Sequence, residues 1–126
     1  LDDRIFAVGG MGPDFELRSG AEVVDLVAGT VSSIAAPRIP RIGAKLVPLA
    51  GRLYLVGGMG RVGGAGLVPV LDVEVYDPAQ DEWRTYPERL PFDPRHIQAF
   101  AWNGRVLVVG TPDRSGRIPL VTVEPM

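Results

Sequence analysis

The sequence predicts an all-β fold, built from four-stranded antiparallel units that repeat along the chain. The first reason is a short apolar strand ending in glycine, which occurs three times, at residues 4–10, 52–58 and 105–111. A spacing of roughly 50 residues between copies indicates repeated supersecondary units. The second reason is the turn residues: 16 glycines and 12 prolines separate short apolar runs, as is typical of strands joined by turns.

The composition limits the classes of protein to which the chain can belong. It has 126 residues, of which 46% are hydrophobic, and its formal net charge is -2. This hydrophobicity excludes a disordered chain, and the near balance of charge gives no reason to expect nucleic acid or an anionic membrane as a partner. No apolar run reaches the roughly 18 residues of a membrane-spanning helix. Without cysteine, the chain has no disulfide framework.

The first unit is predicted to hold three strands. Residues 4–10 are rich in the β-branched and aromatic residues that favour strands. Residues 21–27 alternate between apolar and polar well enough for a second strand, and residues 31–34 form a short outer one. Residues 11–20 are expected to be a loop between the first two strands.

The second unit is predicted to be complete, with four strands, and the third to hold three. Residues 71–77 alternate cleanly, as a half-buried strand does, and residues 59–69 are expected to be a glycine-rich loop. In the third unit, Asn103-Gly104 is a strong hairpin signal. The remaining predicted strands lie at 42–49, 52–58 and 83–86 in the second unit, and at 96–101, 105–110 and 119–124 in the third.

One combination of residues in the second unit resembles the kelch repeat. Gly57-Gly58 ends the second strand, Tyr76 lies in the third, and Trp83 follows seven residues later in the fourth. The resemblance covers essentially the whole chain and implies a β-propeller made of four-stranded blades. The residues that carry the motif are given a structural role: Gly9, Gly10, Gly57, Gly58, Gly110, Tyr76 and Trp83.

The glycines and aromatic residues of this motif are expected to pack together. Glycines would leave room for the aromatic side chains, each of which removes roughly 150–250 Å² from water. The first unit is the least regular copy, because Val24 and Val31 stand where Tyr76 and Trp83 stand in the second, both at an offset of 52 residues.

The repeat units are expected at about 1–37, 38–91 and 92–126. With the strands of a unit lettered a to d from the inside outward, the first unit has b to d and the third has a to c. That is about two and a half blades, whereas closed propellers have typically 4–8. The chain also enters a strand almost at once and does not begin with methionine. We therefore expect a segment of a larger propeller, completed by further blades or by oligomerisation.

The sequence offers little support for catalysis. His96 is the only histidine, whereas zinc and copper sites need several converging ligands, and we interpret it as a residue that leads into a strand. No Gly-x-Ser-x-Gly nucleophile elbow occurs. The glycine-rich stretch 57–66 lacks the following helix that phosphate-binding loops need. We expect no catalytic residue, no metal and no cofactor.

The candidate binding residues lie in loops. In a four-stranded antiparallel blade the b-to-c and d-to-a connections share one face, and here they are the longer and more polar ones. Loops on a rigid scaffold concentrate binding residues, and arginines suit carboxylate ligands through bidentate pairing. The alternative is that these arginines only solvate the loops or pair with neighbouring carboxylates. The candidates are Arg18, Arg61, Arg95, Phe15, Arg38 and Arg114.

Two sets of arginines recur at equivalent places, which favours a structural role for them first. Arg41 and Arg95 precede the inner strand of their units, and Arg4, Arg52 and Arg105 follow the a-to-b turn on the opposite face.

We predict a module that binds a protein or a small acidic ligand through the b–c and d–a loop face. The kelch resemblance implies that most such domains bind without chemistry. It leaves two alternatives open. One is a fragment of a carbohydrate-active kelch enzyme, similar to sialic-acid mutarotases or to carbohydrate oxidases, some of which use copper. The other is a structural repeat fragment without independent activity.

Overall fold

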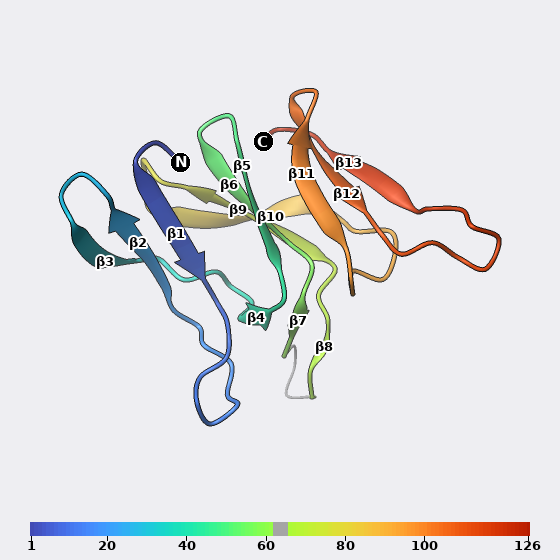
Figure 1. Cartoon of the computed structure of the whole chain (residues 1–126), viewed down its shortest axis with the longest axis horizontal. Coiled ribbons are helices and arrows are strands. Elements are labelled where there is room, and N and C mark those ends of the chain that lie inside the picture. Colours follow the sequence, from blue (N-terminus) through green and yellow to red (C-terminus); the bar gives the residue numbers. More distant parts are fainter. Residues whose placement is uncertain (62–65) are drawn as a thin grey trace.

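The computed structural model describes residues 1–61 and 66–126, and these residues form antiparallel β-sheets arranged side by side (Figure 1). We call the three main sheets blades 1, 2 and 3. Blade 1 holds β1 (Arg4–Val8), β2 (Ala21–Asp25) and β3 (Thr30–Ile34). Blade 2 holds β5 (Lys45–Leu49), β6 (Arg52–Val56), β9 (Asp72–Asp77) and β10 (Glu82–Arg89). Blade 3 holds β11 (Gln98–Trp102), β12 (Arg105–Val109) and β13 (Leu120–Val123).

The all-β prediction and the predicted four-stranded unit are confirmed. Blade 2 has the strand order β10-β9-β6-β5, so its first strand in sequence lies at one edge and its last at the other. The flanking blades have three strands each, in the orders β1-β2-β3 and β11-β12-β13. The described residues contain no helix that is long and apolar enough to cross a membrane.

The predicted equivalence of blades 1 and 2 is also confirmed by the pairing register. Trp83 pairs with Tyr76 in blade 2, and Val31 pairs with Val24 in blade 1. The irregular first unit therefore keeps the backbone pattern of the second and differs from it in the side chains.

A fourth, smaller sheet was not expected. It joins β4 (Arg41–Ile42), β7 (Met59–Gly60) and β8 (Val68–Pro69). The prediction of a loop over 59–69 is therefore wrong at both ends. Strands of two residues are too short to show an alternating pattern, which is why the sequence did not reveal them. Gly63 and Gly64 of this stretch lie outside the described residues.

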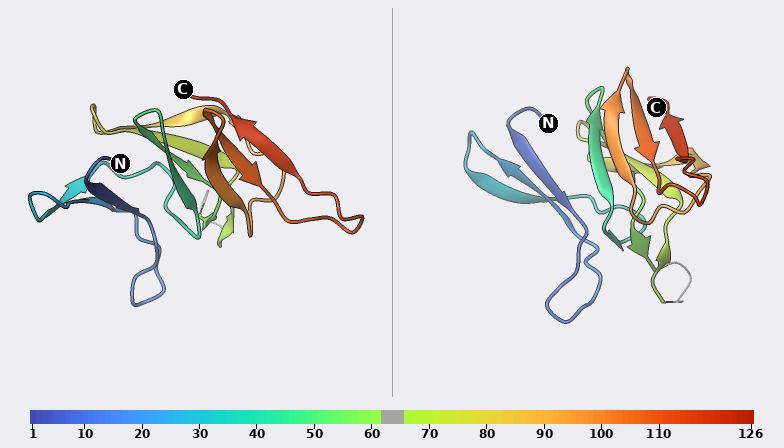
Figure 2. Two further views of the ribbon diagram at one scale, coloured as in Figure 1. Left: turned by 45° about the horizontal axis from the view of Figure 1, so that its top comes forward. Right: turned by 45° about the vertical axis from the view of Figure 1, so that its right-hand side comes forward.

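The hydrophobic core lies between blades 2 and 3. Tyr54 and Val56 of β6 and Val106 and Val108 of β12 are fully buried there. Apolar side chains on facing sheets leave water together, and this burial is the main stabilising contribution. Figure 2 shows that blade 1 diverges from the other two, and the ring of Phe6 meets that of Tyr76 across this boundary, with the centroids 6.1 Å apart.

The C-terminal residues tie blade 3 to blade 2. The Met126 amide donates to the Tyr54 hydroxyl at 2.9 Å, and the Glu124 amide donates to the Tyr86 hydroxyl at 3.1 Å. The Arg52 guanidinium also donates to the Met126 carbonyl. Two tyrosines of blade 2 therefore hold the end of the chain against their own sheet.

The motif aromatics pack as expected, but not against the motif glycines. Tyr76 lies 5.0 Å from Trp83 between ring centroids, and it is 2% exposed. A Cβ on Gly57 would instead meet Ile97 Cδ1 at 2.6 Å, and one on Gly58 would meet the Ile42 carbonyl oxygen at 2.5 Å. The expectation that these glycines make room for the aromatic rings is therefore wrong. They allow the next blade and the segment before β5 to approach the backbone of β6.

Candidate functional site

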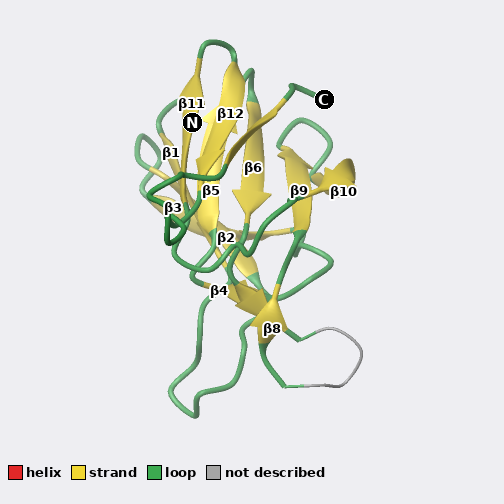
Figure 3. Cartoon of the chain, turned by 90° about the vertical axis from the view of Figure 1, so that its right-hand side faces the viewer, coloured by secondary structure: helices red, strands yellow, loops and turns green. Residues whose placement is uncertain are grey.

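The b–c and d–a connections leave their sheets at the end opposite to the two chain termini (Figure 1). The b–c connections are residues 9–20, 57–71 and 110–119, and the d–a connections are residues 35–44 and 90–97. Figure 3 shows β4 and β8 at this end of the molecule, away from the C-terminus. These connections therefore lie together on one face of the molecule, which we call the loop face. A depression opens on this face between blades 2 and 3.

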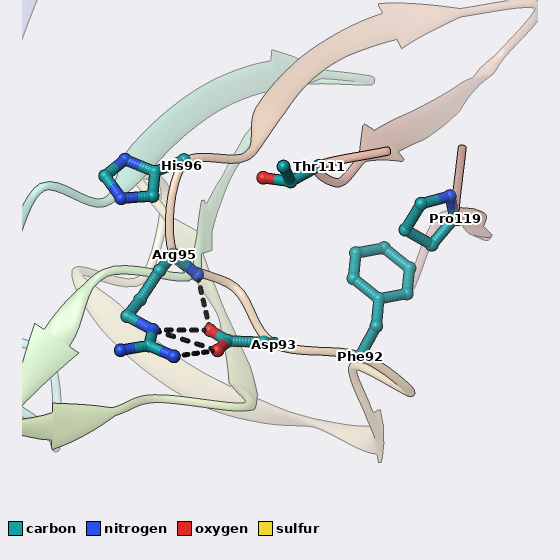
Figure 4. A pocket seen from close by; sticks show the side chains of 6 residues that line it. All are labelled: Phe92, Asp93, Arg95, His96, Thr111 and Pro119. Atoms are coloured by element: carbon teal, nitrogen blue, oxygen red, sulfur yellow. Dashed lines mark hydrogen bonds and ion pairs between the residues drawn. The ribbon is translucent and has the colours of Figure 1, made fainter. Parts of the chain in front are cut away.

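This depression has a volume of about 480 Å³ (Figure 4). The β10–β11 connection supplies four of its lining residues and the β12–β13 connection supplies two. They are Phe92, Asp93, Arg95, His96, Thr111 and Pro119. Because the two connections belong to neighbouring blades, the site exists only where the blades pack together.

Arg95 and Asp93 form the charged part of the depression. Arg95 Nη2 lies 2.5 Å from Asp93 Oδ2, Nε lies 2.9 Å from the same oxygen, and the Arg95 amide donates to Oδ1 at 2.9 Å. The side-chain and backbone hydrogen bonds from Arg95 lower the pKa of Asp93, and the hydrogen bond from Asp93 raises the pKa of Arg95. Both groups are therefore ionised across the physiological range.

The apolar wall of the depression depends on Gly110. A Cβ at this position would lie 2.9 Å from Pro119 Cγ and 3.0 Å from the Phe92 ring. The Gly110 amide also donates to the Pro119 carbonyl at 2.8 Å. The absence of a side chain thus lets Phe92 stand beside Pro119. Gly110 keeps the structural role expected from the motif and shapes this wall through it.

His96 lies at the junction of two depressions. The second has a volume of about 490 Å³ and is lined from β4, β5 and β7 as well as by residues 94–98. Arg95 and His96 line both. His96 has a φ of 59°, which is uncommon for a residue with a side chain and marks a position that its surroundings hold in place. Interpreting His96 only as a residue that leads into a strand missed this location, and a lone histidine in the sequence carries no signal for it.

Of the other predicted site residues, Arg38 is engaged inside blade 2. Its Nη2 lies 2.7 Å from Asp72 Oδ2, and its Nε lies 3.4 Å from Thr85 Oγ1. Asp72 also pairs with Arg89 at 2.8 Å. The Arg38 side chain therefore packs along the outer strands and not beside Arg95.

The remaining predicted site residues lie on separate loops. Phe15 is 80% exposed at the tip of the β1–β2 connection, with a φ of 58°. Arg18 lines a different depression beside blade 1. Arg61 and Arg114 are exposed on the next two b–c connections. The structure therefore brings Arg95, alone among the six candidates, into the depression between blades 2 and 3.

Arg41 has the structural role that its recurrence predicted. Its Nη2 lies 2.6 Å from Glu74 Oε2, and each of the two side chains is 1% exposed. Arg95 is not its structural equivalent, because Gln98 pairs with Val109 as Lys45 pairs with Val56, which puts Pro94 in the place of Arg41. Arg95 lies one residue further along the chain and is exposed.

The chain resembles kelch proteins in sequence and in structure. The Kelch motif family model matches residues 40–89. Kelch-like protein 35 of Mus musculus is 34% identical over 110 residues, which is 87% of this chain and 18% of that protein. An F-box/kelch-repeat protein of Arabidopsis thaliana is 30% identical over 97 residues, which is 77% of this chain and 20% of that protein. The chain thus spans about a fifth of the length of these relatives.

Two solved structures have the same fold. The structure of YjhT superimposes with a TM-score of 0.75 at 25% identity, over 87% of this chain and 32% of that one. A fungal alcohol oxidase solved in complex with copper superimposes with a TM-score of 0.69 at 24% identity, over 86% of this chain and 24% of that one.

Residues 1–61 and 66–126 contain no group of three or more His, Cys, Asp or Glu side chains that could hold a metal ion, and copper sites are built from such groups. The residues 40–89 that match the Kelch motif include blade 2, which is a sheet of four antiparallel strands. The chain therefore contains a kelch repeat and has a fold similar to that of kelch-repeat β-propeller proteins.

Proposed function

We propose that the chain is a binding module whose ligand occupies the depressions between blades 2 and 3 on the loop face. One observation carries this proposal: two depressions of about 480 and 490 Å³ meet at Arg95 and His96. Ligand sites are concave and combine apolar walls with a few convergent polar groups. Phe92 and Pro119 supply the apolar wall, and Arg95 and His96 supply the polar groups.

The ligand class follows from Arg95. Its guanidinium has five N–H donors, and the hydrogen bonds to Asp93 come from Nε and Nη2. The two donors on Nη1 point away from Asp93 (Figure 4) and suit a carboxylate. An acidic peptide of a protein partner and a small acidic sugar both carry a carboxylate. Of these two ligands, the peptide agrees better with the kelch-like relatives.

The test compares two matched arginines. Arg84 pairs with Glu82 at 3.1 Å just as Arg95 pairs with Asp93 two residues away, but Arg84 lies on β10 and lines neither depression. A short polyglutamate peptide and free glucuronate are titrated as separate probes. We expect Arg95→Ala to weaken binding of the recognised probe by more than fivefold, and Arg84→Ala to leave it unchanged.

The outcome of the same titration can overturn the proposal. Equal affinities of the Arg95→Ala and wild-type chains, or equal losses in Arg95→Ala and Arg84→Ala, would remove Arg95 from the binding site. Binding of polyglutamate but not glucuronate would identify the ligand as an acidic peptide, and the reverse would identify it as an acidic sugar.

We also propose that the units at 1–37, 38–91 and 92–126 are part of a larger propeller. The support is the strand count: blade 2 has four strands, whereas β1 and β13 are free edges of three-stranded blades. Free edges promote association with other strands. Sedimentation or native mass measurement is expected to show assembly or association. A stable, monodisperse monomer of 13.5 kDa would contradict it.

A further inference from the structure

Another depression opens on the loop face, beside the two that meet at Arg95. It has a volume of about 480 Å³ and is lined by Pro69 of β8, by Leu71 before β9 and by residues 90–94 of the β10–β11 connection. All of these residues except Asp93 are apolar. We therefore call it the apolar depression.

The walls of the apolar depression are fixed by the fold. The Leu90 amide donates to the Leu71 carbonyl at 2.9 Å, and Leu90 is 4% exposed because it packs in the core between blades 2 and 3. Pro91 and Pro94 restrict the backbone on either side of residues 92–93. The depression is thus formed before a ligand arrives, and filling it requires little ordering of the chain.

The apolar depression adjoins the charged site at Arg95. Phe92 and Asp93 line both this depression and the one that contains Pro119, so these two residues form the ridge between them. Arg95 Nη2 lies 2.5 Å from Asp93 Oδ2. In Figure 4 the Phe92 ring points toward Pro119, whereas the Arg95 guanidinium points away from it. One carboxylate side chain thus separates the apolar depression from the cation that we assign to the ligand.

A ligand that fills both places needs an apolar group close to a carboxylate. Apolar depressions favour apolar groups, because water has few hydrogen-bond partners in them. A small acidic sugar would bring hydroxyl groups into this place, where they would lose hydrogen bonds to water. A peptide can instead carry an apolar side chain near an acidic one. Alternate side chains of an extended peptide point to the same side, about 7 Å apart, so the two groups fit best when they are two positions apart.

We propose that the ligand is an extended acidic peptide with a bulky apolar residue two positions from the carboxylate that binds Arg95. The apolar side chain fills the apolar depression and contacts Leu71 and Pro91. The charge of Asp93 favours an apolar occupant over a second acidic residue, because like charges repel. This inference rests on the proposed function, and it adds to the arginine a site that selects the neighbouring residue of the peptide.

The test compares three synthetic peptides that differ in the presence and position of leucine. The first is Gly-Leu-Ser-Glu-Ser-Leu-Gly, in which a leucine lies two positions from the glutamate on each side, so that the direction of binding does not matter. The second, Gly-Ser-Leu-Glu-Leu-Ser-Gly, has the same composition, but its leucines point to the side opposite to the glutamate when the chain is extended. The third has serine in place of each leucine. The affinity of each for the full chain is measured by NMR chemical-shift titration.

We expect the first peptide to bind at least about fivefold more tightly than the other two, because it buries part of a leucine side chain. Pro91→Gln replaces an exposed wall of the apolar depression by an amide. It should reduce this advantage about threefold and leave the affinity of the serine peptide unchanged. Pro87→Gln is the matched control, because Pro87 is an exposed proline of β10 that lines none of the three depressions. Arg95→Ala should weaken the binding of all three peptides.

Two results would overturn the apolar site. One is equal affinity of the first and second peptides for the wild-type chain, and the other is an advantage of the first peptide that Pro91→Gln leaves intact. Either result, together with weaker binding to the Arg95→Ala chain, would leave the proposed carboxylate site intact. Binding that Arg95→Ala does not weaken would contradict the proposed function itself, and no binding of any peptide would overturn both. The failure of the apolar site and the failure of the proposed function are therefore distinguishable.

Discussion

Arg41 and Glu74 form an ion pair with an N–O distance of 2.6 Å, and only 1% of either side chain is exposed. Burial lowers the pKa of Arg41, while the hydrogen bond and charge of Glu74 oppose this change. The pair joins the segment before β5 to strand β9, across 33 residues of sequence. It therefore fixes how the chain passes from blade 1 into blade 2.

Replacing Arg41 by alanine should destabilise the fold strongly. Glu74 would remain buried without its cation, a change that typically costs about 3–5 kcal/mol of unfolding free energy. Arg84→Ala is the matched control, because its exposed ion pair contributes about 0.2–1 kcal/mol. Urea denaturation followed by circular dichroism measures both. Similar losses in the two variants would show that the buried pair has no special role.

Tyr76→Phe should separate the packing of the motif tyrosine from its hydrogen bond. The hydroxyl donates to Asp81 Oδ1 at 2.6 Å, and burial together with this bond raises its pKa, so it stays protonated. Phenylalanine keeps the ring beside Trp83 and removes only the donor. We expect a loss of about 1.5–3 kcal/mol, the range for hydrogen bonds to charged groups. Tyr54→Phe, where the partner is the neutral Met126 amide, should cost less, and the opposite order in thermal unfolding would refute this account.

Stability should fall in acid partly through Asp81. Its pKa is lowered from 3.8 by the Ala35 amide first and the Tyr76 hydroxyl second. A carboxylate whose folded pKa is depressed stabilises the protein above its unfolded pKa, and this contribution is lost as the pH falls below about 3.8 through the folded value. Asp81→Asn removes the titration, so its urea midpoint should depend less on pH below about 4. Parallel curves for the variant and the wild-type chain would exclude this contribution.

Gly58 and Gly51 offer a direct comparison of two glycines with positive φ. Both have left-handed backbones, at 85° and 78°, but a Cβ on Gly58 would lie 2.5 Å from the Ile42 carbonyl oxygen, whereas one on Gly51 meets nothing within 4 Å. Gly51→Ala should therefore cost only the conformational penalty of about 1–2 kcal/mol. Gly58→Ala should cost about 1–3 kcal/mol more, because the backbone must move. Equal denaturation midpoints for the two variants would show that the backbone at Gly58 can move away from the Ile42 carbonyl without a loss of stability.

The strands of the three blades could be predicted from the sequence because each has a local pattern. Alternation in residues 71–77 and the Asn103-Gly104 turn depend on neighbouring residues alone. The register of blade 1 was predictable as well, because the internal repeat gave the offset of Val24 from Tyr76.

The site was less predictable, because it depends on contacts between distant segments. Whether an arginine is buried or exposed depends on its place in the register: Arg41 meets the carboxylate of Glu74, whereas Arg95 lies one residue beyond the equivalent place and pairs with Asp93 instead. His96 was missed for the same reason, since its position follows from the packing of two blades. Strands β7 and β8 were missed because a strand of two residues is too short to show an alternating pattern.

The hydrogen bonds of Met126 to Tyr54 and of Glu124 to Tyr86 have a consequence for the order in which the molecule opens. They join blade 3 to blade 2, and the buried residues of the core between these blades include none from blade 1. Cooperative units in a fold follow shared burial more closely than sequence. Blades 2 and 3 should therefore unfold together, and the amides of β1 to β3 should exchange with solvent sooner. Blade 1 would then be a loosely attached sheet that can change its position while blades 2 and 3 stay rigid.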